Sequence, residues 1–312
     1  MHTGPKRLHA LLAILLLLWI TGSGCSLLRR AALNQVADAA AGSGTTFASD
    51  DDPELVKAAV PFSLKVLESL LAESPEHQGL LLAAARGFTQ YSYGFVQQEA
   101  DELEARDLAA AEALRTRARR LYLRARQYGL RGLDVSHADF SKALRANPGA
   151  AVGAATTADV PLLYWTAAAL GSAISLSKDN PELVAELPAM EALIDRALAL
   201  DESFGRGAIH GFLISYEMSR HGAPGDPAAR ARAHFERAMA LSGGGDAAPL
   251  VALAEAVTVQ QQNVKEFESL LNRALAINPD AHLDTRLQNL IMQRRARWLL
   301  SRKTELFLIE NE

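Results

Sequence analysis

Three short segments decide the fold of this chain: Arg196-Ala-Leu-Ala-Leu-Asp201, Arg237-Ala-Met-Ala-Leu-Ser242 and Arg273-Ala-Leu-Ala-Ile-Asn278. Each has the composition of a helix end, because Ala, Leu and Met are strong helix formers and turn residues follow. The segments begin 41 and 36 residues apart, close to the length of one helical hairpin. A helix pair cannot bury its own apolar face, so such pairs stack on their neighbours. The spacing therefore predicts degenerate tetratricopeptide-like (TPR-like) hairpins packed into a compact bundle or solenoid.

The rest of the chain also predicts helices, so the expected fold class is all-α. Of the 312 residues, 49% are hydrophobic, Ala and Leu dominate, and no stretch alternates apolar and polar residues as a strand would. Turn and breaker residues bound each expected helix. The expected helices span Pro53–Glu73, Gln78–Glu99, Asp107–Tyr128, Ser136–Arg145, Val160–Leu176, Pro181–Leu200 with a kink or break at Pro188, Phe204–Arg220, Asp226–Leu241, Pro249–Gln260, Val264–Ile277 and Leu283–Phe307.

The first 24 residues have the layout of a secretory signal peptide. Lys6 and Arg7 precede an apolar run from Leu11 to Ile20, and small residues lead from there to Cys25. The run is shorter than the roughly 20 apolar residues that a membrane-spanning helix needs. Since the sole cysteine of the chain directly follows the small residues, we expect lipid attachment to its sulfur and a mature chain that begins at Cys25. Gly22 stands where lipoprotein signals usually carry an aliphatic residue, and an ordinary secreted protein is the alternative.

The expected domain organisation is simple. Residues 1–24 form the signal, residues 25–52 a tether or linker, and residues 53–312 one TPR-like helical domain. The linker contains Ala41-Gly42-Ser43-Gly44, and the acidic residues Asp50 to Asp52 before Pro53 mark the start of the first helix.

Charge and motif content exclude several functions. The net charge is −4, and −6 without Lys6 and Arg7, so the chain has no overall attraction for nucleic acid. A single cysteine allows no intramolecular disulfide and no thiolate metal site. No HExxH, GxSxG or P-loop pattern occurs, so we expect no catalytic residue, no metal and no cofactor. His210 is expected to be a buried or capping histidine, and a helical hydrolase without a recognisable motif is left as an alternative.

The few aromatic residues, 6% of the chain, gather in two places. Phe88, Tyr91 and Phe95 are spaced i, i+3, i+7 on one helix face, and Tyr164 and Trp165 open a helix that continues with small residues. Such a pattern fits either core packing or an apolar cavity whose mouth carries Tyr and Trp polar tips. These five side chains are our candidates for a hydrophobic ligand site.

Seven segments in order resemble the T component associated with TRAP transporters (TatT), where TRAP denotes the tripartite ATP-independent periplasmic class. They are Asn34–Ala39, Phe47–Glu54, Glu73–His77, Gly87–Tyr91, Tyr164–Ala168, Ala208–Ile214 and Gln293–Leu300. The resemblance implies a periplasmic, all-helical, TPR-like lipoprotein that forms homotrimers and pairs with the substrate-binding P subunit of the transporter. It also implies a hydrophobic pore or cleft for a lipid or another apolar molecule.

The function expected from these observations is a non-catalytic accessory protein for solute uptake. Ser26 follows the cysteine in place of the Asp that commonly retains lipoproteins at the inner membrane, so we expect an anchor in the inner leaflet of the outer membrane. The alternative is a TPR-type scaffold lipoprotein for envelope assembly that has no small-molecule site.

Overall fold

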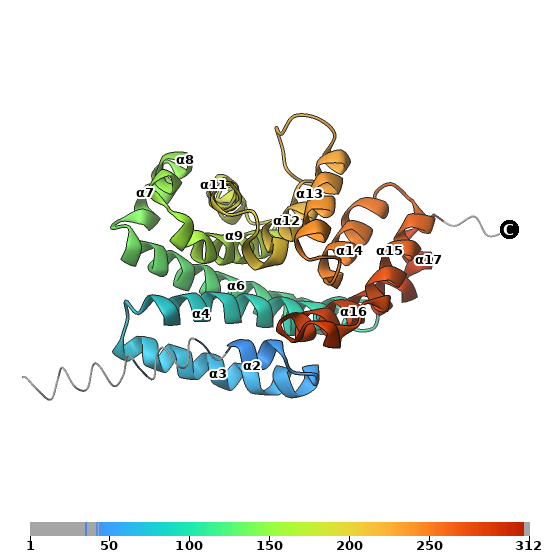
Figure 1. Ribbon diagram of the computed structural model, residues 1–312, viewed down its shortest axis with the longest axis horizontal. Helices are drawn as coiled ribbons and strands as arrows, with labels where there is room; N and C mark the ends of the chain where they lie inside the picture. The colour runs from blue at the N-terminus through green and yellow to red at the C-terminus, as the bar shows by residue number, and fades with distance from the viewer. Residues whose placement is uncertain (1–34, 36–41, 43, 309–312) are drawn as a thin grey trace, which may run out of the picture.

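The computed structural model describes residues 35, 42 and 44–308, and within these residues it contains helices and no strand (Figure 1). The predicted all-α fold class is confirmed. Cys25, the predicted signal peptide and most of the predicted linker lie outside the described residues. Among the described helices, none combines the length and apolar character that a bilayer-spanning segment requires.

The first half of the described chain contains two long helices, α3 and α6, separated by shorter ones. Its elements are α2 (Gly44–Ala48), α3 (Pro53–Glu73), α4 (Gln78–Tyr91), the π-helical segment η1 (Ser92–Gln97), α5 (Gln98–Leu103), α6 (Leu108–Ser136), α7 (Phe140–Ala146), α8 (Pro148–Ala151), the 3-10 turns η2 (Val152–Ala154) and η3 (Thr157–Asp159), and α9 (Val160–Ser175).

The second half consists of helices of 16 residues or fewer. Its elements are α10 (Pro181–Val184), α11 (Leu187–Leu200), α12 (Phe204–Tyr216), α13 (Pro227–Leu241), α14 (Ala247–Leu253), the π-helical segment η4 (Ala254–Thr258), α15 (Val264–Ala276), the 3-10 turns η5 (Pro279–Ala281) and η6 (Leu283–Thr285), α16 (Arg286–Ser301) and α17 (Lys303–Leu306).

Aspartate side chains start several helices where the sequence predicts a start. The carboxylate of Asp52 accepts two backbone N–H groups of the first turn of α3 at 3.0 Å, and Pro53 occupies the first helical position. Asp107 caps α6 and Asp226 caps α13 in the same way. These bonds satisfy N–H groups that have no partner inside the helix, so the local sequence fixes these helix starts.

Successive helices stack as layers (Figure 1). α3 packs on α4, α4 on α6, α6 on α9, and α9 on α11, while α12 and α13 form the next close pair. The buried apolar residues fall into two clusters, one running from α3 to α12 and the other from α12 to Phe307. Two of the repeated segments contact earlier parts of the chain: Arg196 donates to the carbonyl of Ala155 at 2.6 Å, and Arg237 binds Glu202 in the connection between α11 and α12.

The last long helix, α16, returns to the N-terminal helices. Arg295 is buried, with its guanidinium 3.0 Å from the carboxylate of Asp101 in α5 and 2.5 and 2.9 Å from that of Glu255 in η4. Its neighbour Arg294 binds Glu102 at 2.6 and 2.9 Å. One buried cation thus joins three segments that lie up to 194 residues apart.

One predicted boundary is wrong for a physical reason. The helix expected to end at Tyr128 continues to Ser136, and the next helix starts at Phe140. A Cβ on Gly129 would lie 2.1 Å from Oγ1 of Thr166 in α9. Gly129 therefore allows α6 to pack closely on α9, and it does not mark a helix end.

Of three further expectations, one agrees with the structure and two differ. The expected break near Pro188 is confirmed, because α10 ends at Val184 and α11 begins at Leu187. The first three residues after Phe204 have positive φ angles of 56°, 59° and 93°, so the regular part of α12 starts later than expected. The last expected helix, Leu283–Phe307, is divided into η6, α16 and α17.

Candidate functional site

The first aromatic group predicted from the sequence lies in the core. Phe88, Tyr91 and Phe95 are each between 3% and 6% exposed. Phe88 stacks on Tyr128 with ring centroids 5.9 Å apart, and Tyr91 contacts Phe95 at 5.8 Å. In this conformation the three rings fill space between helices, and their part in ligand binding stays a prediction.

The second aromatic group is more accessible. Tyr164 and Trp165 are half-buried, with their ring centroids 4.9 Å apart in an edge-to-face arrangement, and Tyr164 also contacts Phe204 at 5.3 Å. Burial raises the pKa of Tyr164 to about 12, so its hydroxyl is protonated at neutral pH. The structure brings Tyr164 and Trp165 together with Phe204, a residue outside the sequence prediction.

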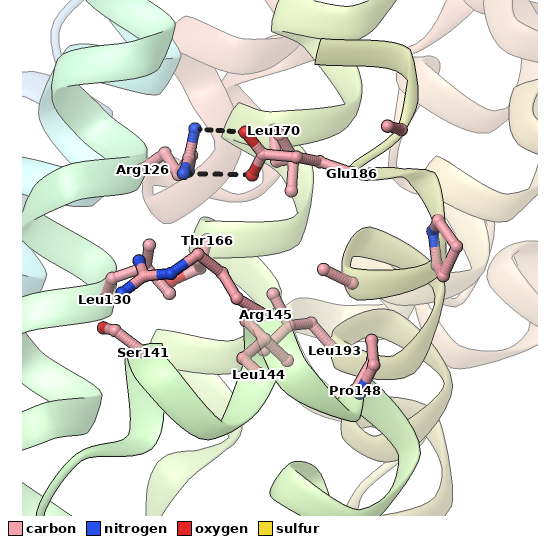
Figure 2. A pocket seen from close by; sticks show the side chains of 13 residues that line it. Arg126, Leu130, Ser141, Leu144, Arg145, Pro148, Thr166, Leu170, Glu186 and Leu193 are labelled. Carbon is pink, nitrogen blue, oxygen red and sulfur yellow. Dashed lines mark hydrogen bonds and ion pairs between the residues drawn. The ribbon is translucent and has the colours of Figure 1, made fainter. Parts of the chain in front are cut away.

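A pocket of about 230 Å³ lies between α6, α9 and α11, with α7 and α8 at one end (Figure 2). Four leucines from four different helices give it an apolar wall. Its lining residues are Arg126, Leu130, Ser141, Leu144, Arg145, Pro148, Thr166, Leu170, Ala185, Glu186, Pro188, Ala189 and Leu193. None of the five predicted aromatic residues lines it, although Thr166 directly follows Trp165.

Three charged side chains line the pocket. The guanidinium of Arg126 in α6 meets the carboxylate of Glu186, just before α11, in two contacts of 3.0 Å. Arg145 of α7 extends its side chain toward Leu130 and Thr166 (Figure 2). Sequence reasoning missed these residues because Arg126 and Glu186 are 60 positions apart, and no local pattern indicates that they meet.

A pair of histidines joins α12 to α13. Nδ1 of His210 lies 2.8 Å from Nδ1 of His234, and Nε2 of His210 lies 3.3 Å from the carboxylate of Glu202, which also binds Arg237. Burial lowers the pKa of both histidines, and for His234 the proximity of His210 adds to the effect. Since one ring nitrogen must donate and the other accept, this contact requires at least one neutral imidazole.

Acidification from pH 7 to pH 5 is expected to destabilise the protein through this pair. An unfolded histidine has a pKa of about 6.5, so below that pH the unfolded chain binds protons that the folded chain binds less readily. Stability begins to fall near the pKa of the unfolded histidines and continues to fall until the pH is below the lowered pKa values of the folded histidines. Carboxylates whose pKa folding lowers, such as Glu217, contribute losses only in the more acidic range near and below the ordinary glutamate value.

Urea unfolding at pH 7 and pH 5 measures this effect. Between pH 7 and pH 5, His234→Gln is expected to lose about half as much stability as the wild type, because only one of the two histidines with a lowered pKa remains. An unchanged loss in His234→Gln would contradict the assignment. The sequence expectation for His210, a buried histidine in a packed helix pair, agrees with the structure.

No cluster of His, Cys, Asp or Glu suited to a metal ion occurs among residues 35, 42 and 44–308. The fold and the pocket define an all-helical protein of stacked helices that carries a small, largely apolar recess.

Comparison with known proteins gives the family. The sequence profile of the TRAP transporter T-component family matches residues 49–307, and the chain belongs to this family. An uncharacterized protein of Treponema pallidum (strain Nichols) is 29% identical to it over 266 residues, which cover 84% of this chain and 82% of that protein. Family membership gives the chain an accessory role in TRAP transport, a periplasmic process, and the family is not known for catalysis.

Proposed function

We propose that this protein docks the substrate-binding P subunit of a TRAP transporter and shelters a hydrophobic ligand during uptake. The observation that carries the proposal is the family match, which spans residues 49–307 and so includes nearly all of the described helices. The largely apolar pocket between α6, α9 and α11 supports the ligand part, because ligand sites are concave and lined mainly by apolar side chains together with some polar groups.

A pull-down from an envelope extract tests the docking. We expect the immobilised protein to retain a TRAP-type binding protein. Recovery of envelope-assembly proteins without any such binding protein would instead support the alternative, a TPR-type scaffold lipoprotein with no small-molecule site.

Native mass spectrometry after gentle extraction tests the sheltered ligand. We expect a bound lipid or another apolar molecule on the protein. Tyr164 and Trp165 remain candidates for contact with it, because both are partly exposed and present polar tips beside apolar rings. A protein that carries no ligand and binds no added amphiphile would contradict this part of the proposal.

The proposed location is the periplasm, with a lipid on Cys25 anchored in the inner leaflet of the outer membrane. An anchor of this kind would hold the docking surface where transport components meet. Cys25→Ala is expected to move the protein from the membrane fraction to the soluble periplasmic fraction. Unchanged partition with the membrane would contradict lipidation.

We further propose the homotrimer implied by the family, with contacts between copies on α3. Leu55, Phe62 and Val66 are 58%, 76% and 38% exposed. Their spacing of seven and four residues puts them on one face of α3. Clustered exposed apolar side chains of this size mark contact surfaces. Light scattering on the purified protein is expected to give three times the mass of one chain, and the mass of a single chain would contradict the trimer.

A further inference from the structure

We infer that the pocket between α6, α9 and α11 binds a small amphiphilic carboxylate, with Arg145 holding the carboxylate and the leucine walls holding an alkyl or aryl body. This inference rests on the proposed sheltering of a hydrophobic ligand, and it names the chemical class of that ligand and the residue that selects it.

The size of the pocket limits the ligand. A buried apolar cavity of about 150 Å³ accommodates benzene, which has six non-hydrogen atoms. By the same ratio, the pocket of about 230 Å³ holds roughly nine non-hydrogen atoms. A long-chain lipid is therefore too large to be enclosed, whereas a medium-chain or aryl-substituted acid fits.

The walls of the pocket favour an apolar body. Leu130, Leu144, Leu170 and Leu193 face it from α6, α7, α9 and α11. The two hydroxyl groups of the lining already have hydrogen-bond acceptors: that of Thr166 donates to the carbonyl of Leu162 at 2.6 Å, and that of Ser141 donates to the carboxylate of Asp134 at 2.5 Å. Since these donors are engaged, the walls offer little to a sugar or another polyol.

The charges of the pocket favour an anionic head group. Arg126 and Glu186 neutralise each other through their double contact. Arg145 makes no hydrogen bond or ion pair with any residue in the described part of the chain, and its side chain extends toward Leu130 and Thr166 (Figure 2). One positive charge is left beside an apolar wall, and a guanidinium matches the two oxygens of a carboxylate.

The position of Arg145 also orients the ligand. Arg145 is an exposed residue, whereas Leu170 and Leu193 are almost completely buried. The carboxylate would therefore stay near solvent, where its desolvation costs little, and the body would enter toward the leucines. Such an arrangement keeps the head group accessible to a partner protein while the apolar part is covered.

Calorimetric titration of the full mature protein with octanoate and octan-1-ol tests the inference, since the two probes share a chain length and differ in the head group. We expect octanoate to bind more tightly than octan-1-ol. Arg145→Gln should weaken octanoate binding about tenfold and leave octan-1-ol binding unchanged, because a charge-assisted hydrogen bond is lost. Glu186→Gln should strengthen octanoate binding severalfold, because it releases Arg126 to act as a second cation.

Arg120→Gln is the matched control. Arg120 is an exposed arginine of α6 that does not line the pocket, and its replacement removes the same charge from the chain. If Arg120→Gln weakened octanoate binding as much as Arg145→Gln does, the effect would be one of overall charge and the inference would be wrong.

Two other outcomes separate this inference from the proposed function. Binding of octanoate that is equal in the wild type and in Arg145→Gln, with octan-1-ol also bound, would overturn the carboxylate assignment and leave the sheltering of an apolar ligand intact. Binding of neither probe by the wild type would overturn the pocket as a ligand site, and retention of the P subunit in the pull-down would still support the accessory role.

Discussion

Gly129→Ala is expected to lower the free energy of unfolding by about 2 kcal/mol. The added Cβ would lie 2.1 Å from Oγ1 of Thr166, 3.1 Å from its Cβ and 3.4 Å from its Cα, so α6 and α9 would have to separate. Overpacking of this kind costs about 1–3 kcal/mol or more, and the better helix propensity of Ala returns up to about 1 kcal/mol. Urea unfolding followed by circular dichroism measures the difference.

Two comparisons make this prediction specific. Thr166→Ala removes the oxygen that the new methyl group would meet, so the double variant Gly129→Ala/Thr166→Ala is expected to be more stable than Gly129→Ala alone. Gly211 lies inside α12, and a Cβ there would meet nothing within 4 Å, so Gly211→Ala should be neutral or stabilising by up to about 1 kcal/mol. Equal stability of the Gly129→Ala and wild-type proteins would contradict the close contact of α6 and α9.

Arg295→Ala is expected to cost about 3 kcal/mol of stability, since removing one partner of a buried ion pair leaves uncompensated charge. Asp101 and Glu255 would then both lose the cation that they now share. The figure is at the lower end of the usual range because the Glu255 side chain is 38% exposed and water can partly replace the guanidinium. The loss should appear in the same unfolding measurement.

Arg297→Ala is the control for Arg295→Ala. Arg297 lies in the same helix, α16, and is exposed, so its removal is expected to change stability by less than about 0.5 kcal/mol. A similar stability of the Arg295 and Arg297 variants would show that α16 is not held to α5 and η4 by the buried charge.

Local sequence signals predict the helix starts of this protein well. Asp52, Asp107 and Asp226 cap the helices that their positions indicate, and Pro188 marks the break between α10 and α11. These features depend on residues within one turn of each other. The capping hydrogen bonds can therefore be predicted from the sequence without knowledge of the tertiary structure.

Features that depend on contacts between distant segments could not be predicted in this way. Gly129 has the local character of a helix end and instead allows α6 to approach α9. The π-helical segments η1 and η4 were not expected from the sequence, and Arg295 finds its partners in α5 and η4 only after folding.

The same distinction between local signals and contacts of distant segments applies to the candidate site. The aromatic spacing identified Phe88, Tyr91 and Phe95 as one helix face, and the structure places these rings in the core. The pocket is assembled from five helices and one connection, and its charged residues, Arg126, Arg145 and Glu186, carry no shared local pattern. Periodicity in a single helix cannot show what two helices enclose between them.

The most direct test of the proposed function uses two purified components. The mature protein and the TRAP binding protein of the same organism are mixed at tens of micromolar and separated by size-exclusion chromatography with light scattering. The proposal predicts a complex whose mass contains both proteins and whose formation survives Arg145→Gln. Separate elution of the two proteins at their individual masses would contradict the docking proposed for this chain.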